Sequence, residues 1–186
     1  MAQIISALLL SVSCAFGHGF EAESEEIAVL LGLESGMQVA DVGAGDGEFG
    51  MELAARVGEG GHVYIQEIDD GELKKIRKRV RRSKLDNVTV VEGRTDDTML
   101  PENCCDALLL RFVYHHITER EAMLDSLHRS VRPDGLLLVI ERGEHGGHGI
   151  PSEQTIEEWT ARGFQVIERQ TGWGGHDDHS AVLFRR

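Results

Sequence analysis

Short apolar runs alternate with amphipathic stretches along most of this chain. Apolar runs bounded by turn residues are typical of buried strands, whereas apolar residues at helical spacing predict helices with one buried face. We expect strands over residues 37–42, 62–67, 87–93, 106–110, 136–141, 164–170 and 180–184. We expect helices over residues 21–33, 48–57, 70–83, 118–131 and 152–161.

Local signals set the expected ends of several elements. Ser24 is expected to start the first helix, and Gly32 or Gly36 to end it. Thr118 and Glu121 have the spacing of a capping box, which favours a helix start at Thr118. The segment 132–135 (Arg-Pro-Asp-Gly) is expected to form a turn before the fifth strand.

The order of elements predicts the fold class. Strand and helix alternate five times, and two final strands form a hairpin. Because crossovers between parallel strands are right-handed, this order predicts a doubly wound, mostly parallel α/β sheet with helices on both faces. The expected strand 106–110 agrees with this fold, since a continuous apolar run is typical of a strand buried on both faces.

A glycine-rich turn follows the first expected strand and opens a helix. Asp41 precedes Gly43, Ala44, Gly45 and Gly47. In doubly wound proteins, a strand, a glycine turn and a helix N-terminus form the unit that binds an adenosyl cofactor. A side chain in place of these glycines would block the turn or hold the ligand off the backbone, and the Asp41 carboxylate can accept bonds from a cationic or hydroxyl-bearing ligand.

The glycine spacing separates two classes of cofactor. The dinucleotide fingerprint is G-x-G-x-x-G, but here the third glycine is Gly47 and residue 48 is Glu. A nicotinamide oxidoreductase is therefore disfavoured. Glu67 ends the second expected strand 24 residues beyond Gly43, where an acid accepts hydrogen bonds from ribose hydroxyls. The alternative is that Glu67 is a surface residue at a strand end.

These motifs, in this order, resemble those of the class I S-adenosylmethionine (SAM) dependent methyltransferases. The resemblance extends over about residues 24–186 and includes the Asp-x-Gly-x-Gly-x-Gly motif and the segments 63–69, 113–116 and 132–136, with Asp134 where the family commonly has glycine. It implies a Rossmann-like sheet of order 3-2-1-4-5-7-6 with strand 7 antiparallel, and SAM as the cofactor. It also implies a set of cofactor-binding residues, with Asp96 at the adenine amine: Asp41, Gly43, Ala44, Gly45, Gly47, Glu67, Ile68, Asp96 and Arg111.

Some of these residues allow a second interpretation. Asp97, next to Asp96, is nearly as well explained as a turn-forming residue. Arg111 could instead hold an anionic substrate.

Candidate catalytic residues follow the fourth expected strand. His115 and His116 are candidates for a general base or an acceptor-positioning group, and Tyr114 for a substrate contact. A base is needed only if the methyl acceptor arrives protonated. The alternative is that both histidines only pack beside the cofactor.

Two histidine-rich loops lie on the expected substrate side. One contains His145 and His148, and the other contains His176 and His179. Substrate contact by His148 and His176, a solvated loop and a divalent metal are the three alternatives, but the spacing matches no established metal motif. We assign no metal residue.

Charge is distributed unevenly. The chain has a net charge of −13, which argues against general nucleic-acid binding, so we expect a small-molecule substrate and no nucleic-acid partner. Residues 74–84 nevertheless contain eight Lys and Arg. They predict either a solvated outer helix face or a patch for nucleic acid or anionic membrane.

The first 18 residues are apolar and are set apart from the domain expected over 19–186. They resemble a signal-peptide core or membrane anchor, with Cys14 as an alternative lipoprotein site. However, residues 1–18 contain no Lys or Arg, which a signal peptide usually has before its apolar core. If the segment is instead a helix packed on the domain, we expect a cytoplasmic protein. Adjacent Cys104 and Cys105 are expected not to bridge each other, and Cys105 to be a small buried residue.

The sequence thus favours a SAM-dependent methyltransferase acting on an unidentified small molecule. The alternative from another class is a non-catalytic SAM-binding or interaction protein that keeps the fold without turnover. A macromolecular substrate held by the basic helix is a further alternative.

Overall fold

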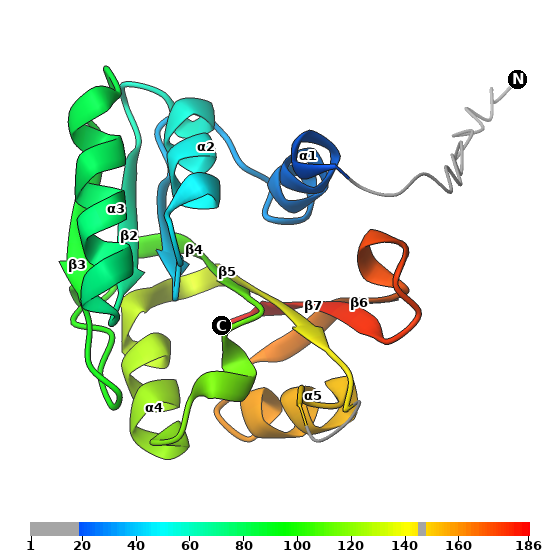
Figure 1. Ribbon diagram of the computed structural model, residues 1–186. Helices are drawn as coiled ribbons and strands as arrows, with labels where there is room; N and C mark the ends of the chain where they lie inside the picture. The colour runs from blue at the N-terminus through cyan, green and yellow to red at the C-terminus, as the bar shows by residue number, and fades with distance from the viewer. Residues whose placement is uncertain (1–18, 145–147) are drawn as a thin grey trace, which may run out of the picture.

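The computed structural model describes residues 19–144 and 148–186, so the predictions for residues 1–18 and His145 lie outside the described residues. Seven strands form one sheet in the order β3-β2-β1-β4-β5-β7-β6 (Figure 1). β7 is antiparallel to both β5 and β6, and the other neighbours are parallel. This confirms the fold class and strand order expected from the sequence. The strands are β1 (Gln38–Val42), β2 (His62–Glu67), β3 (Val88–Glu92), β4 (Cys105–Arg111), β5 (Val131–Arg142), β6 (Gln165–Thr171) and β7 (His179–Arg185).

Helices cover both faces of the sheet. They are α1 (Phe20–Leu30), α2 (Glu48–Val57), α3 (Asp70–Arg82), α4 (Arg120–Ser130) and α5 (Ser152–Thr160), with short 3-10 turns η1 (Tyr114–His116) and η2 (Trp173–Gly175). Side chains of α1, α2 and α3 pack in one core, and side chains of α4 and α5 pack in the other. No helix in the described ranges has both the length and the apolar character needed to cross a membrane.

β4 shows why the central strands are continuously apolar. Leu108 and Leu110 point into the core beneath α4 and α5, and Ala107 and Leu109 point into the opposite core. Successive side chains of a strand face opposite sides, so a strand covered on both sides needs apolar residues at every position.

Three local predictions were wrong. α1 begins at Phe20, and the Ser24 hydroxyl donates within the helix to the Glu21 carbonyl (3.1 Å). α4 begins at Arg120 without a side-chain cap, so the capping box from Thr118 does not form. Residues 132–135 belong to β5 rather than to a separate turn. The chain bends there through Asp134, whose positive φ of 64° is tolerated by Asp better than by most residues.

The expectation for the cysteines was half right. Cys105 is fully buried, as expected, but the structure joins it to Cys104 in a disulfide between adjacent residues. In regular strands consecutive side chains point to opposite faces. Cys104 precedes the first residue of β4, so the pair lies at the junction of a loop and a strand rather than within a regular strand.

Candidate cofactor and acceptor site

The glycine turn lies between β1 and α2 at the carboxyl edge of the sheet. Gly43, Gly45 and Gly47 all have positive φ, at 65°, 57° and 79°. The end of β2 holds the turn in place: the Gly43 N–H donates to Gln66 Oε1 (3.1 Å), and the Gly45 N–H donates to Glu67 Oε2 (2.8 Å). The sequence therefore builds a backbone cradle whose shape depends on the second strand.

Gly43 leaves no room for a side chain. A Cβ there would lie 2.2 Å from Val113 Cγ2, and its φ of +65° is already unfavourable for other residues. We expect Gly43→Ala to lower the free energy of unfolding by about 3 kcal/mol, from overpacking and backbone strain together. Chemical denaturation measures this loss.

A matched control, Gly163→Ala, separates overpacking from backbone strain. Gly163 has a φ of +88° with nothing within 4 Å of its missing Cβ, so Gly163→Ala should cost only the smaller backbone contribution. Adding Val113→Ala to Gly43→Ala should restore part of the lost stability. Equal effects of the two single alanine variants would contradict the steric explanation.

Glu67 is buried, and its carboxylate connects the glycine turn to the segment that follows β2. Its Oε1 accepts from the backbone N–H groups of Ile68 (2.6 Å) and Asp69 (3.0 Å), in addition to the Oε2 bond with Gly45. A carboxylate has about four acceptor positions, so these three bonds leave capacity for a ligand hydroxyl.

A pocket of about 460 Å³ opens at this edge and contains Gly43, Glu67 and Ile68. His116, a candidate from the sequence, also lines it. Most of the other lining residues were not predicted; they lie at the ends of β1 and β2, on irregular segments or inside α4. The full lining is Val42, Gly43, Gln66, Glu67, Ile68, Arg94, Thr95, Val113, His116, Ile117, Thr118 and Met123.

The acids after β3 lie differently from expectation. Asp96 is exposed and does not line this pocket, whereas its neighbours Arg94 and Thr95 do. Asp97 accepts from the Met99 N–H (2.8 Å) and the Ser126 hydroxyl (2.9 Å). The Met99 bond is the main cause that lowers the pKa of Asp97. Asp97 therefore acts as the turn residue that the alternative interpretation described.

Asp41 lies beneath the glycine turn and is 3% exposed. Burial raises the pKa of its carboxyl from 3.8 to about 7, against a smaller lowering by the Gly50 backbone N–H and by Arg111. Its Oδ2 is one of three buried side-chain polar atoms without a hydrogen-bond partner among the described residues. Buried polar atoms are normally satisfied, so this oxygen fits a site completed by a ligand or an ordered water.

Arg111 at the end of β4 is anchored by α1. Its Nε and Nη2 donate to the two Glu23 carboxylate oxygens at 2.7 and 2.8 Å, and the Trp173 Nε1–H donates to Glu23 Oε1 at 3.0 Å. The guanidinium also stacks on the rings of Phe49 (4.4 Å) and Phe112 (4.6 Å). The predicted cofactor ligand Arg111 thus ties α1, β4 and the β6–β7 loop together.

A second pocket of about 360 Å³ adjoins this cluster. Phe112, which has a positive φ of 53°, presents its ring there, and its centroid lies 5.0 Å from that of His179. His176 also lines the pocket and stacks on His179 at 4.5 Å. The complete lining is Glu23, Arg111, Phe112, Trp173, Gly174, His176 and His179.

His115 is held by a buried acid that the sequence analysis missed. Its Nδ1 lies 2.8 Å from Glu141 Oε1, and its backbone N–H donates to Glu141 Oε2 at 3.1 Å. Glu141 is only 2% exposed and ends the apolar run of β5. A carboxylate at Nδ1 directs the other ring nitrogen, Nε2, to act as the proton acceptor.

His116 stacks on His115 with ring centroids 3.9 Å apart and lines the first pocket. Burial, and then the neighbouring His115, lower the pKa of His116. Burial also lowers the pKa of His179. Both rings are therefore biased towards the neutral form that can accept a proton. His148 is exposed, and its charge is one of the smaller influences on His116.

Tyr114 differs from its predicted role. Its side chain is fully buried in the core beneath α4 and α5, and its hydroxyl donates to Glu158. Arg120 stacks on its ring at 4.8 Å. The structure therefore places Tyr114 in the core rather than at either pocket. Within residues 19–144 and 148–186, no group of three metal-ligating side chains comes together.

A glycine cradle, an acid at the second strand end and a doubly wound sheet define an α/β protein that binds an adenosyl cofactor. Residues 39–135 match the family model of the methyltransferase domain. The chain belongs to this family, the class I SAM-dependent methyltransferases, which confirms the expected family and SAM as its cofactor.

Curated relatives match the same region. A ubiquinone/menaquinone biosynthesis C-methyltransferase UbiE from Shewanella sp. (strain ANA-3) is 33% identical over 111 residues, which cover 59% of this chain and 44% of the relative. The corresponding protein of Serratia proteamaculans is 32% identical over the same length. The matched segment thus spans less than half the length of these relatives.

Solved structures resemble nearly the whole described chain. A SAM-dependent methyltransferase from Aquifex aeolicus has a TM-score of 0.76 and 25% identity, covering 87% of this chain and 88% of that one. A coclaurine N-methyltransferase bound to N-methylheliamine and S-adenosylhomocysteine shares the fold, with a TM-score of 0.72, 16% identity and coverage of 89% and 73%.

Proposed function

We propose that this protein transfers a methyl group from SAM to a small planar acceptor. The observation that carries the proposal is the arrangement of the two pockets. One is lined by Gly43 of the glycine cradle and by Glu67. The other is lined by aromatic and imidazole rings together with Arg111, and Val113, two residues beyond Arg111, lines the first.

The residues present suit SAM. The unpartnered Asp41 Oδ2 supports a cationic ligand, because SAM carries positive charge and no cation among the described residues is hydrogen-bonded to this oxygen. Glu67 would hold the ribose hydroxyls, and Ile68 would cover the adenosine. When bound, SAM supplies a methyl group already activated on a sulfonium, so the protein's main tasks are alignment and exclusion of water.

His115 has the role of a general base in this proposal. Glu141 holds its Nδ1, so Nε2 is the ring nitrogen that would take a proton from an acceptor hydroxyl, thiol or ammonium. His115 lines neither pocket itself and stacks on His116, which lines the first. The negative charge of Glu141 stabilises the imidazolium that forms.

The acceptor class follows from the second pocket and the relatives. The rings of Phe112 and Trp173 suit a flat aromatic acceptor. UbiE proteins are named as C-methyltransferases of ubiquinone and menaquinone biosynthesis. Carbon methylation of an electron-rich hydroxylated ring is therefore the first reaction to test. Loss of the hydroxyl proton would make the ring carbon nucleophilic, and the C–H proton of that carbon would leave after methyl transfer to restore the aromatic ring.

Calorimetry on the full chain tests the cofactor step. We expect wild type to bind SAM and S-adenosylhomocysteine, and Glu67→Gln to bind both about tenfold more weakly. Its NH2 group must replace either the acceptor of the Gly45 N–H or the acceptor of the Ile68 and Asp69 N–H groups, which leaves fewer acceptor positions for a ribose hydroxyl. Unchanged affinity in Glu67→Gln would contradict this role. Binding without methyl transfer across a panel of hydroxylated aromatics would favour the non-catalytic alternative.

A further inference from the structure

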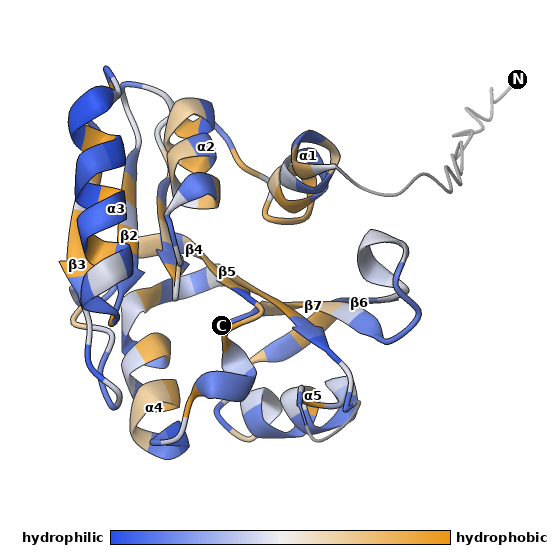
Figure 2. Ribbon diagram, viewed as in Figure 1, coloured by the Kyte–Doolittle hydropathy of each residue, from blue (hydrophilic) through white to orange (hydrophobic). Residues whose placement is uncertain are grey.

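The outer side of α3 is strongly basic on a chain of net charge −13. Eight of the chain's 19 Lys and Arg lie between residues 74 and 84. Leu73 and Ile76 are fully buried against the sheet, so the cations project outward, and Figure 2 shows the outward turns of α3 as hydrophilic. We call the exposed cations of α3 the basic face: Lys74, Lys75, Lys78, Arg81 and Arg82.

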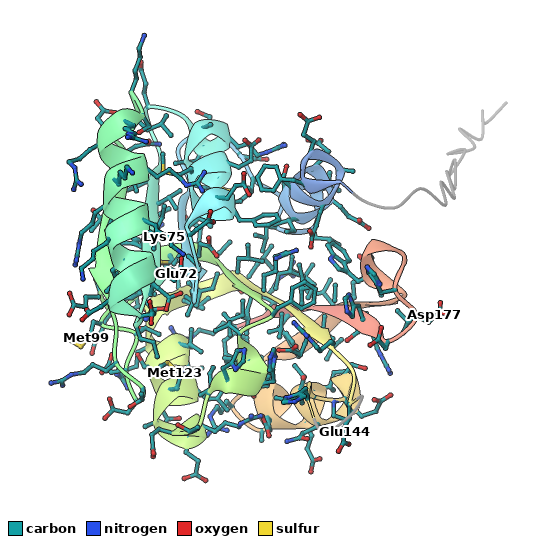
Figure 3. All side chains as sticks on the ribbon, viewed as in Figure 1. Glu72, Lys75, Met99, Met123, Glu144 and Asp177 are labelled. Carbon is teal, nitrogen blue, oxygen red and sulfur yellow. A yellow bond between two sulfur atoms is a disulfide. The ribbon has the colours of Figure 1, made fainter. Side chains whose placement is uncertain are left out.

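Local ion pairs neutralise only part of this charge. Lys75 pairs with Glu72 at 2.6 Å (Figure 3), Arg77 pairs with Glu92 at 3.0 Å, and Arg79 pairs with Asp46. Across the described ranges, the remaining cations of the basic face have no carboxylate within ion-pair distance.

The unpaired cations repel one another along the helix. Lys78 lies one turn from both Lys74 and Arg82, and like charges at this spacing destabilise a helix. An anionic surface placed against them would remove that repulsion.

The basic face also contains a cleft. Lys75, Lys78, Arg79 and Arg82 line a space of about 620 Å³ together with Asp46. Four cations around an open cleft suit phosphate groups, because each ammonium or guanidinium can donate to a phosphate oxygen.

Two features favour a membrane over a nucleic acid. α3 contains no aromatic residue, so the face has no stacking platform for bases. Met99, in the segment that follows β3, is 51% exposed and projects at the edge of the molecule in Figure 3. An exposed apolar side chain at the edge of the molecule can enter the interface of a lipid bilayer.

We propose that the basic face of α3 docks this protein on membranes that contain anionic lipids, with lipid phosphates in the cleft lined by Lys78 and Arg82. This docking is independent of the proposed methyl transfer. Of the alternatives that the sequence left open for residues 74–84, it selects the anionic membrane over the solvated face and the nucleic acid.

Co-sedimentation of the full chain with lipid vesicles tests the proposal. The vesicles contain phosphatidylcholine alone or phosphatidylcholine mixed with phosphatidylglycerol. We expect binding to the mixed vesicles to exceed binding to phosphatidylcholine and to fall at high salt. Lys78→Gln with Arg82→Gln should lower the partition coefficient on mixed vesicles about 25-fold, since each cation near an anionic surface contributes about fivefold.

A charge-matched control isolates the face. Arg162→Gln with Arg169→Gln removes the same charge from the segment after α5 and from β6, where the two arginines pair with Asp125 and Glu153. This control should bind the mixed vesicles like wild type. All variants should keep wild-type circular dichroism and S-adenosylhomocysteine affinity, which separates docking from folding and from the cofactor site.

Two results would overturn the proposal. The first is equal vesicle binding by wild type and the α3 double variant. The second is binding to a fluorescent single-stranded oligonucleotide that the double variant loses, without preference for phosphatidylglycerol vesicles, which would assign the face to nucleic acid.

Discussion

Replacing Asp41 with asparagine is expected to stabilise the ligand-free protein and to weaken its binding of SAM. Burial raises the pKa of Asp41 from 3.8 to about 7. Below pH 3.8 the carboxyl is protonated in the folded and unfolded states, so its ionisation does not lower the free energy of unfolding. As the pH rises from 3.8 to 7, the unfolded chain ionises while the folded chain holds its proton, so stability falls by about 4 kcal/mol.

Asparagine has almost the same shape and never ionises. We expect Asp41→Asn to recover about 2 kcal/mol at neutral pH, because the neutral amide still leaves one polar group imperfectly satisfied. Thermal unfolding of the ligand-free protein across pH measures this gain. The gain should vanish near pH 4, where the wild-type carboxyl is also neutral.

The effect on the cofactor has the opposite sign. A bound cation favours the ionised carboxylate, so SAM binding should lower the pKa of Asp41 and release a proton below about pH 7. SAM affinity should therefore rise with pH up to about 7 in wild type, whereas in Asp41→Asn it should be flat and about 100-fold weaker at neutral pH. Calorimetry in buffers of different ionisation enthalpy measures the released protons directly.

Asp97→Asn is the control, because it removes the charge of a second carboxylate elsewhere in the chain. The pKa of Asp97 is lowered by its bond from the Met99 N–H. Asp97→Asn should therefore lose stability at neutral pH and keep the pH dependence of SAM binding. A flat affinity profile in wild type, or unchanged affinity in Asp41→Asn, would show that Asp41 does not act on the cofactor.

The apolar runs and helical spacings of the sequence predicted the fold, because each is a local pattern that indicates one strand or one helix. The apolar run of β4 and the alternating order of strands and helices leave one arrangement of the sheet. The errors in secondary structure lie at two helix starts and at residues 132–135, which belong to β5. Ser24 and Thr118 can satisfy a helix N-terminus, but α1 and α4 begin at Phe20 and Arg120 without a side-chain cap.

Contacts between distant segments explain what the sequence could not predict at the site. Glu23 and Arg111 are 88 positions apart, and only the packing of α1 beside β4 brings them together. Tyr114 lies in an irregular turn, where no periodicity tells whether a ring points to the pocket or to the core. Glu141 did have a usable signal, since it ends an apolar strand as Glu67 does.

Glu141→Gln is expected to slow methyl transfer about 100-fold while leaving SAM affinity unchanged. The Glu141 carboxylate accepts from His115 through both oxygens and from the Arg142 N–H at 2.8 Å. Glutamine keeps the size of the side chain but removes the charge that stabilises His115 when its Nε2 takes a proton. Loss of assistance to a general base costs about 100-fold or more in rate.

The measurement is single-turnover methyl transfer, at a series of pH values, to the acceptor found in the hydroxylated-aromatic panel. Glu158→Gln is the matched control, because Glu158 accepts from the core residue Tyr114, whereas Glu141 accepts from His115. Glu141→Asp should recover part of the rate, since it restores the charge. If instead Glu141→Gln transferred at the wild-type rate at every pH, His115 would not be the base. The acceptor would then lose its proton to water or arrive already deprotonated, and the His115–Glu141 pair would serve only to hold η1 against β5.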